Sequence, residues 1–304
     1  MAEPTTNIPA TKPSFIPHQV KEEKVLSPWM EAWQSFRKNK AALFGLGLVI
    51  FFILLAIFAD FLAPYGFKEQ NMANKHLSPS AAHWFGTDEF GRDILSRIIY
   101  GARISLTVGF GAVAGSVVFG SGLGILAGYY GKWVDGIISR CFDILLAFPS
   151  ILLAIAIVAM LGPSLRNALI AIAIINVPTF GRLVRSRVLS VKEEEYIVAA
   201  RAIGMKDNRI LIHHVLPNSM APIIVQGSLA IATAIIEAAA LGFLGLGAQP
   251  PSPEWGKMLA DSKDFIINAP WTVFFPGIAI VLTVLGFNLI GDGLRDALDP
   301  RMKN

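Results

Sequence analysis

Charge and cysteine are both scarce in this chain of 304 residues. Only 16% of the residues are charged, whereas 54% are hydrophobic. Soluble domains average about 25% charged and about 45–50% apolar residues. The imbalance excludes a disordered chain, a coiled coil and most soluble enzymes. The single cysteine, Cys141, excludes an internal disulfide framework. The composition therefore favours a protein that crosses the membrane several times.

Motifs of catalysis and of metal binding are also missing. A P-loop needs Ser or Thr after its Gly-Lys pair, but the two Gly-Lys pairs here are followed by Trp133 and Met258. The five histidines form no HExxH motif, no cysteine pair is available for zinc, and GxSxG is absent. We therefore expect no catalytic residue, no metal site and no cofactor bound by this chain.

Six apolar segments fit the length of membrane-spanning helices. They cover about residues 41–64, 104–129, 144–161, 167–181, 217–236 and 266–290. Prolines lie inside several of them, among them Pro149, Pro178 and Pro276, which neighbouring helices can tolerate in a bundle. Gly120, Gly124 and Gly128 repeat every four residues in the second segment, a spacing that favours close approach of helix backbones. The sequence thus predicts an all-α membrane protein with six transmembrane helices.

The segments between the spans are polar. Residues 1–27 are interpreted as a disordered tail, and residues 28–40 as an interfacial helix with Trp29, Trp33 and Phe36 on one face. Residues 65–103 form a loop, residues 130–142 a short charged turn, and residues 293–304 a C-terminal tail. Within the loop, the i, i+4 pairs Asp88–Arg92 and Asp93–Arg97 predict a short, exposed surface helix.

Basic residues are distributed unevenly between the two sides of this arrangement. Eighteen of the 26 Lys and Arg residues fall on the side that carries both termini and residues 182–216, and eight fall on the other side. The positive-inside rule therefore places both termini in the cytoplasm and residues 65–103 outside it. Topology accounts for the net charge of +4, so no nucleic-acid partner is expected.

The cytoplasmic segment 190–216 has the pattern of two short helices. Tyr196, Ala199, Ala200 and Ile203 share one helical face, and Gly204 can end that helix. A second helix is expected to start near Asp207–Asn208 and to run into Leu216-Pro217 and the fifth span. Such a pair predicts a rigid knob at the membrane surface; a solvated loop with some helix is the alternative.

This segment resembles the EAA loop of binding-protein-dependent ABC importer permeases. The shared pattern is Ala199-Ala200-x3-Gly204 followed by Leu216-Pro217. The chain departs from the motif at Val198, where the family has Glu, and at His214, where it has Ile. Residues 37–41, 83–105, 237–256 and 291–301 further resemble DppC/OppC-type subunits of the dipeptide/oligopeptide/nickel branch.

The resemblance implies a fold, a function and a set of partners. The expected fold is that of a type I, MetI-like permease with cytoplasmic coupling helices. The expected function is import of di- or oligopeptides by alternating access in a bacterial or archaeal plasma membrane. The partners would be a second permease subunit, two ATPase subunits that use ATP and Mg²⁺, an extracytoplasmic binding protein and membrane lipid. The coupling residues would be Tyr196, Ala199, Ala200, Arg201, Gly204, Leu216 and Pro217.

Other functions stay open at this stage. The same machinery in other members of the branch imports nickel or glutathione, an ion-coupled secondary carrier is less favoured, and an intramembrane enzyme is least favoured. Two polar residues are candidates for the substrate path: Glu237, near the outer boundary of the fifth span, and Asn176 in the fourth. For Glu237 the alternative is pairing with a cation, and for Asn176 it is an interhelical hydrogen bond. Asp88, Arg92 and Asp93 are candidates for contact with a binding protein.

Overall fold

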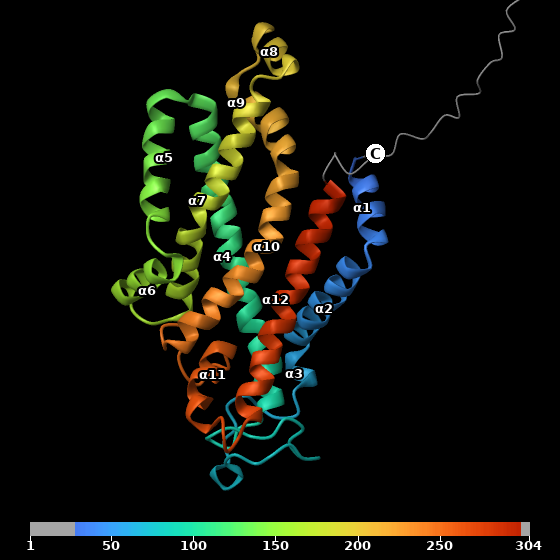
Figure 1. Ribbon diagram of the computed structural model, residues 1–304, viewed down its shortest axis with the longest axis vertical. Helices are drawn as coiled ribbons and strands as arrows, with labels where there is room; N and C mark the ends of the chain where they lie inside the picture. Colours follow the sequence, from blue (N-terminus) through green and yellow to red (C-terminus); the bar gives the residue numbers. More distant parts are fainter. Residues whose placement is uncertain (1–27, 299–304) are drawn as a thin grey trace, which may run out of the picture.

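The computed structural model describes residues 28–298, with side chains from residue 30 onward, and it is helical through most of this range (Figure 1). No strand occurs in the described range, which has a single isolated bridge between Thr87 and Asp93. The predicted tail 1–27, the side chain of Trp29 and residues 299–304 lie outside what the structure describes.

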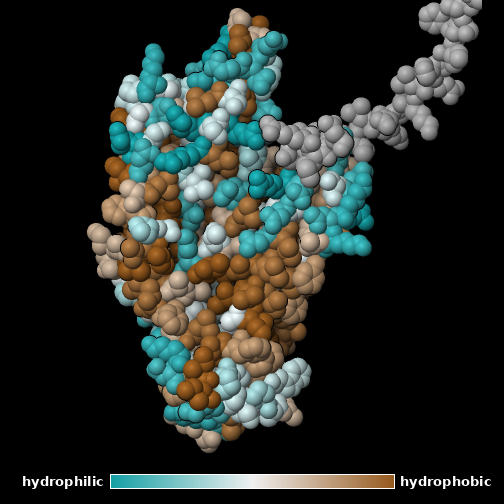
Figure 2. All heavy atoms as spheres, in the orientation of Figure 1, coloured by the Kyte–Doolittle hydropathy of each residue, from teal (hydrophilic) through white to brown (hydrophobic). Residues whose placement is uncertain are grey.

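Five helices within residues 28–298 are long and apolar enough to cross a membrane. They are α2 (Lys40–Ile57), α4 (Ile94–Tyr130), α7 (Leu165–Val191), the continuous helix Asp207–Phe243 and α12 (Trp271–Leu298). A sixth crossing arises if α5 (Lys132–Leu146) and α6 (Ser150–Leu161) count as one span. The hydrophobic residues form a broad band between two hydrophilic ends (Figure 2).

The third span differs most from its prediction. Residues 130–142 are not a short turn, because α5 already begins at Lys132. The span is also broken: α5 and α6 meet at an angle of 93°. Pro149 lies at this break, and a proline disfavours helix at the residue before it. The chain therefore descends as α5 beside α7 and then turns sideways as α6 (Figure 1).

Helices α4 and α7 pack closely along the centre of the bundle. A Cβ atom placed on Gly120 would lie 2.6 Å from the carbonyl oxygen of Val177, and one on Gly128 would lie 2.8 Å from Cβ of Val188. A Cβ atom on Gly124 would meet the carbonyl oxygen of Gly181. In lipid, such close approach of backbones gives van der Waals packing between helices. The close approach predicted from the glycine spacing is confirmed.

The remaining elements form the two ends of the molecule. At one end, residues 63–93 and 244–270 fold together as a compact cap that contains η1 (Met72–Asn74), α11 (Trp255–Ser262) and η3 (Lys263–Phe265). Short α3 (Ala59–Leu62) leads into it from α2. At the other end, residues 195–215 form the knob, made of α8 (Glu195–Ala202), α9 (Asp207–Ile210) and η2 (Leu211–Val215). The cap and the knob lie at opposite ends of the bundle (Figure 1).

Two predicted boundaries shift. Helix α4 begins at Ile94, ten residues before the predicted start of the second span. Helix α12 extends to Leu298, so the predicted C-terminal tail 293–304 begins inside a helix. In helix α1 (Pro28–Lys38), the rings of Trp33 and Phe36 stack with centroids 5.9 Å apart, as expected for a shared face. Phe36 is buried at Gly293 of α12, whereas Trp33 is half exposed.

Candidate functional site

The knob is fixed to the bundle by an apolar cluster. Ile197 of α8 and Ile210 of α9 are fully buried against Val184 and Val188 of α7 and Val215 at the start of α10. Helix α10 itself spans Leu216–Phe243. Burying a side chain of this size contributes about 1.5–3 kcal/mol. The cluster therefore holds both short helices on the ends of two long ones.

The turn between the two short helices needs a glycine. Gly204 has φ of +82°, in the left-handed region, and follows the end of α8. The amide of Met205 donates to the carbonyl of Ala200 at 3.0 Å, and the amide of Gly204 donates to that of Arg201 at 2.9 Å. These two bonds form a Schellman motif, which satisfies the free carbonyls of a helix end. The predicted role of Gly204 in ending the helix is confirmed.

Polar and aromatic contacts attach the knob to α4 and α10. The hydroxyl of Tyr129, near the end of α4, donates to Oδ1 of Asp207 at 2.5 Å, and the Arg201 guanidinium lies 5.1 Å from the centre of the Tyr129 ring. Nδ2 of Asn218 donates to the hydroxyl oxygen of Tyr196 at 3.0 Å. Together with the apolar cluster on α7, these contacts join the knob to three long helices, so the knob and the bundle are mechanically connected.

The face of α8 that points away from the bundle differs from the prediction. Tyr196, Ala199 and Ile203 are exposed, Ile203 to 81%, whereas Ala200 is buried beside Ile197. The predicted single face of Tyr196, Ala199, Ala200 and Ile203 is therefore wrong, since Ala200 packs inward. The exposed residues, with Val198 at 57% and Ile212 at 61%, form an apolar surface that no described residue covers.

The remaining coupling candidates lie where α9 continues into α10. Residues 211–215 form one π-helical turn, in which the amide of Leu216 donates to the carbonyl of Leu211. Pro217 has no amide hydrogen, and its ring crowds the preceding turn of the helix. The wider π-helical turn before it holds one extra residue and gives the ring space. Nδ2 of Asn218 instead satisfies the carbonyl of His214 at 2.7 Å. The second short helix is thus continuous with the fifth span.

Asn176 and Glu237, the two candidates for the substrate path, are in direct contact. Nδ2 of Asn176, in α7, donates to Oε2 of Glu237, in α10, at 3.2 Å, and also to the carbonyl of Ile172 at 3.0 Å. Both side chains are half-buried. Glu237 forms no ion pair with any residue in the range 30–298, so the cation pairing considered for it is not found there.

Two ion pairs that the sequence did not indicate join α5 to α7. Arg185 donates to both carboxylate oxygens of Asp135, at 2.5 and 2.6 Å, and Arg182 donates to Asp143 at 2.5 Å. From the sequence, residues 130–142 are interpreted as a short charged turn and residues 182–216 as a polar segment between two spans. No spacing rule connects residues about 40–50 positions apart, so only the structure could pair them.

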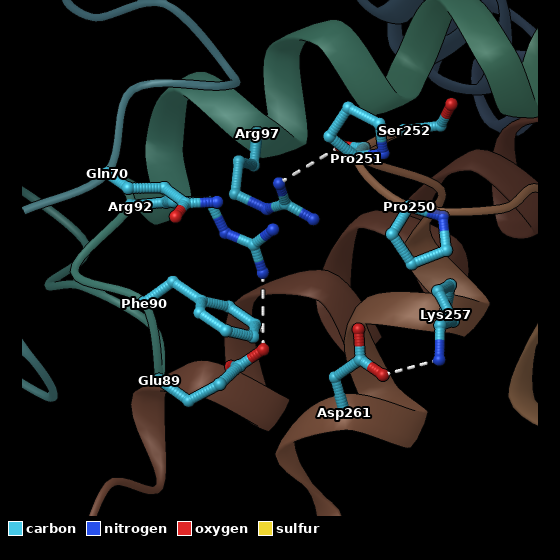
Figure 3. Close-up of a pocket in the computed structure, with 10 residues that line it drawn as sticks. All are labelled: Gln70, Glu89, Phe90, Arg92, Arg97, Pro250, Pro251, Ser252, Lys257 and Asp261. Carbon is cyan, nitrogen blue, oxygen red and sulfur yellow. Dashed lines mark hydrogen bonds and ion pairs between the residues drawn. The ribbon is translucent and has the colours of Figure 1, made fainter. Parts of the chain in front are cut away.

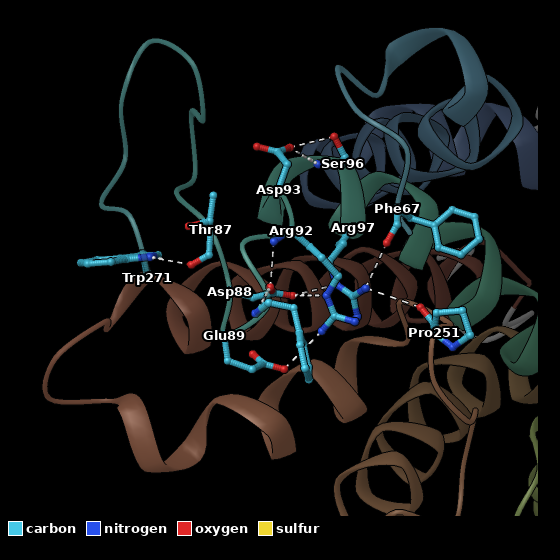
Figure 4. Close-up of polar contacts among 11 residues, drawn as sticks. Phe67, Thr87, Asp88, Glu89, Arg92, Asp93, Ser96, Arg97, Pro251 and Trp271 are labelled. Carbon is cyan, nitrogen blue, oxygen red and sulfur yellow. Dashed lines mark hydrogen bonds and ion pairs between the residues drawn. The ribbon is translucent and has the colours of Figure 1, made fainter. Parts of the chain in front are cut away.

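Asp88, Arg92, Asp93 and Arg97 (Figure 4) are buried, which corrects the predicted exposed surface helix. Residues 88–93 form a turn, and Asp93 caps α4 by accepting from the amide and the hydroxyl of Ser96. Asp93 also lies 3.0 Å from Nδ1 of His83 and forms no ion pair with Arg97. Asp88, Arg92 and Asp93 are each 4% exposed. They shape the cap from inside and are not presented to a binding protein.

Two tryptophans close the cap onto the bundle. Nε1 of Trp255 donates to the carbonyl of Ile98 at 3.1 Å, and Nε1 of Trp271 donates to that of Thr87 at 3.3 Å. Glu254 is 3% exposed and accepts from the amides of Gly256 and Lys257, both at 2.8 Å. Burial raises the pKa of Glu254 to about 7. No group of three or more potential metal ligands occurs in residues 28–298.

Comparison with known protein families gives two matches that together cover most of the chain. Residues 120–304 match the model of the binding-protein-dependent transport system inner membrane component. Residues 27–79 match the N-terminal transmembrane domain of oligopeptide transport permease C.

Similar curated proteins extend over nearly the whole chain. A dipeptide transport system permease protein DppC of Alkalihalophilus pseudofirmus is 67% identical over 92% of each chain. A di/tripeptide transport system permease protein DppC of Pseudomonas aeruginosa is 48% identical over 98% of each. A glutathione transport system permease protein GsiD of Escherichia coli is 50% identical over 93% of this chain and 94% of the relative.

A solved structure shares the fold. The inward-facing MetNI methionine ABC transporter has a chain that superposes with a TM-score of 0.55, at 17% sequence identity, over 67% of this chain and 97% of its own. At this identity the likeness supports the fold alone, and it agrees with the expected MetI-like arrangement of helices.

Proposed function

Because the chain belongs to the family of inner-membrane components of binding-protein-dependent transport systems, we propose that it is one permease subunit of an ATP-driven importer of di- or oligopeptides. It is a multi-pass membrane permease. The peptide substrate is supported by relatives named for dipeptides and di/tripeptides that match at least 92% of the chain. An external binding protein delivers the peptide on the cap side, in the plasma membrane of a prokaryote.

The observation that carries the ATP-driven mechanism is the exposed apolar face of the knob. Val198, Ala199 and Ile203 point away from a base fixed to α4, α7 and α10. An apolar surface rimmed by polar residues marks a protein contact. We assign it to one of two ATPase subunits, the other binding a second permease. ATP and Mg²⁺ are used there, and this chain binds no cofactor.

The orientation follows from the same assignment. The knob side also carries the end of α12 and the start of α1 (Figure 1). The topology inferred from the sequence assigns eighteen of the 26 Lys and Arg residues to this side. This side, with both termini, is cytoplasmic. ATP binding draws the two knobs together, and the long helices transmit that motion to the membrane, so that the path opens alternately to each side.

Asn176 and Glu237 line the path in this proposal. The carboxylate of Glu237 is half-buried without a cationic partner among residues 30–298. An ionisable group within the spanning helices is costly, which makes it a candidate for a functional role. The ammonium group of a passing peptide would supply the missing charge. Glu237→Gln should lower peptide uptake, and unchanged uptake of an N-acetylated peptide, which lacks the ammonium group, would locate the defect at that group.

Ala199→Trp tests the proposed ATPase contact. Ala199 is exposed, so the bulky side chain should leave the fold intact but prevent close approach of the ATPase. We expect loss of ATPase co-purification and of ATP-dependent dipeptide uptake in proteoliposomes. Met72→Trp, at an exposed position on the cap, is the matched control and should retain both. Normal coupling in Ala199→Trp, or ATP-independent uptake by this chain alone, would refute the proposal.

Glutathione is the second candidate substrate, because GsiD of Escherichia coli is 50% identical. Competition by glutathione against labelled dialanine in the reconstituted importer separates the two. With glutathione added in tenfold excess over dialanine, a dipeptide importer should still take up labelled dialanine. A glutathione importer should no longer take up dialanine under the same conditions. Loss of uptake on collapse of a proton gradient, with ATP present, would instead favour an ion-coupled carrier.

A further inference from the structure

At the junction of its two segments, the cap has a cavity of about 280 Å³ that is open on one side (Figure 3). Helix α4, the Pro250–Ser252 loop and α11 form its walls. Five charged side chains line it: Glu89, Arg92, Arg97, Lys257 and Asp261. The function proposed above makes no use of this cavity, which lies outside the spanning segments that hold Asn176 and Glu237.

Two of the three cations in the cavity are paired within the cap. Nε of Arg92 donates to Oδ2 of Asp88 at 2.6 Å, and its Nη2 donates to Glu89 at 3.2 Å. Nζ of Lys257 lies 2.6 Å from Oδ1 of Asp261. The charges of these two cations are therefore compensated by the cap itself.

Arg97 is compensated less well, because its ion pair with Asp88 is long and Asp88 is shared with Arg92. Its side chain is 2% exposed, and its Nη1 donates only to two neutral carbonyls, those of Phe67 at 3.2 Å and Pro251 at 3.5 Å. Its Nε has no hydrogen-bond partner. The carboxylate nearest to it, that of Asp88, lies 3.5 Å away and is already bonded to Arg92. One terminal nitrogen of Arg97 points into the cavity (Figure 3).

A buried guanidinium with these partners is costly, because loss of water around a cation is repaid only by a well-placed anion. An arginine holds a carboxylate through short, charge-assisted hydrogen bonds. A dianion such as phosphate fits less well here, since Glu89 and Asp261 also face the cavity. We propose that this cavity binds a single carboxylate group through Arg97.

The carboxylate has two possible sources, which experiment separates. One is a free solute on this side of the membrane, such as the C-terminus of a short peptide. The other is an acidic side chain of the protein that docks on the cap. Both present the same group to Arg97. Both are tested by measuring binding, so the test does not depend on ATP-driven uptake.

Gln70→Glu supplies the carboxylate from within the chain. Gln70 is exposed on the cavity wall and takes no part in the buried ion pairs. The nearly isosteric change should occupy Arg97 and exclude an external carboxylate. Gln70→Met, of similar size and uncharged, is the matched control. Arg97→Lys keeps the positive charge but removes the forked donors; if this buried variant fails to fold, the Gln70 pair decides alone.

The first readout uses the full-length chain, with the subunits that co-purify, in nanodiscs. Dialanine and its C-terminal amide are titrated by calorimetry. A free-solute site predicts that dialanine binds to wild type and to Gln70→Met, and that its amide binds to both at least tenfold more weakly. In Gln70→Glu, dialanine should bind as weakly as its amide.

The second readout is the affinity of the nanodisc complex for its purified binding protein. A docked side chain predicts at least a tenfold weaker complex with Gln70→Glu and with Arg97→Lys, and an unchanged one with Gln70→Met. Either pattern supports the carboxylate site and identifies its source. If Gln70→Glu has the same affinity as wild type both for dialanine and for the binding protein, the proposal is overturned. This outcome does not depend on whether the chain transports peptides.

Discussion

The two ends of the molecule use polar and apolar residues in opposite ways. The cap buries charge: Asp88, Arg92 and Arg97 are each at most 4% exposed and lie in a network of ion pairs and hydrogen bonds (Figure 4). The knob exposes apolar surface, with Ile203 at 81% and Ile212 at 61%. Buried charge with fixed partners gives a rigid shape, whereas exposed apolar surface gives a contact. The cap is therefore built to hold its form, and the knob to bind.

The strongest test of this comparison is Asp88→Ala. Asp88 accepts from the backbone amides of Phe90 and Arg92 at 2.9 Å and from the Arg92 side chain at 2.6 Å. Its removal leaves Arg92 and Arg97 buried with too little negative charge. We expect a loss of about 3–5 kcal/mol in the free energy of unfolding, measured by thermal unfolding of the purified protein in nanodiscs.

Asp60→Ala is the matched control for an exposed ion pair. Asp60 and Arg103 lie 3.1 Å apart with side chains 62% and 45% exposed. Exposed pairs contribute at most about 1 kcal/mol, so the unfolding temperature should hardly change. Equal losses in the two variants would contradict the view that burial makes the cap rigid.

Ile197→Ala should loosen the knob without affecting the cap. Ile197 is fully buried in the cluster that anchors α8. The cavity left behind should cost about 3 kcal/mol, measured as hydrogen exchange of the α8 and α9 amides that is about a hundredfold faster. Ile203→Ala, at an exposed position of the same helix, should leave exchange unchanged and weaken ATPase binding. Slower uptake with unaltered exchange in Ile197→Ala would contradict the anchoring role.

Much of the bundle could be predicted from the sequence, because its signals are local. The apolar segments locate the spans, the spacing of Gly120, Gly124 and Gly128 indicates the close face of α4, and Gly204 marks the turn in the knob. Each of these depends on a periodicity or a backbone preference that neighbouring residues reveal.

The parts that could not be predicted depend on contacts between distant residues. The charges at positions 88–97 have the spacing of a solvated helix, yet Arg97 is buried and donates to the carbonyls of Phe67 and Pro251, from distant parts of the chain. The hydrogen bond between Asn176 and Glu237 joins residues 61 positions apart. On α8, Ile197 is buried in one cluster with Val184 and Val188, although a face made of Tyr196, Ala199 and Ile203 fits the same helical period.

Glu254 gives the cap a pH dependence. Its pKa is raised from 4.5 to about 7 by burial, so the folded protein favours the protonated acid. The contribution of Glu254 to stability is therefore highest at or below pH 4.5 and falls as the pH rises through about 7. The loss is at most about 3 kcal/mol, from 1.36 kcal/mol per pKa unit.

Glu254→Gln should remove this pH dependence. The amide oxygen can still accept a backbone hydrogen bond at the start of α11, but the side chain no longer titrates. Thermal unfolding at pH 5 and pH 8 should show a smaller difference for the variant than for wild type. Parallel pH profiles of the two proteins would exclude Glu254 as the titrating group.

The smallest expected effect is that of Gly204→Ala in the knob. A Cβ atom on Gly204 would meet nothing within 4 Å, so the cost comes only from φ of +82°, which an L-residue adopts at about 1 kcal/mol. That cost corresponds to about fivefold faster exchange at the end of α8, with normal unfolding of the cap. Gly136→Ala is the control, because Gly136 is helical, also has open space around it, and should gain slightly in stability. A rigid, preformed knob predicts that even this small loosening lowers coupled ATPase activity, whereas a knob that folds only upon its partner would show faster exchange without any change in coupling.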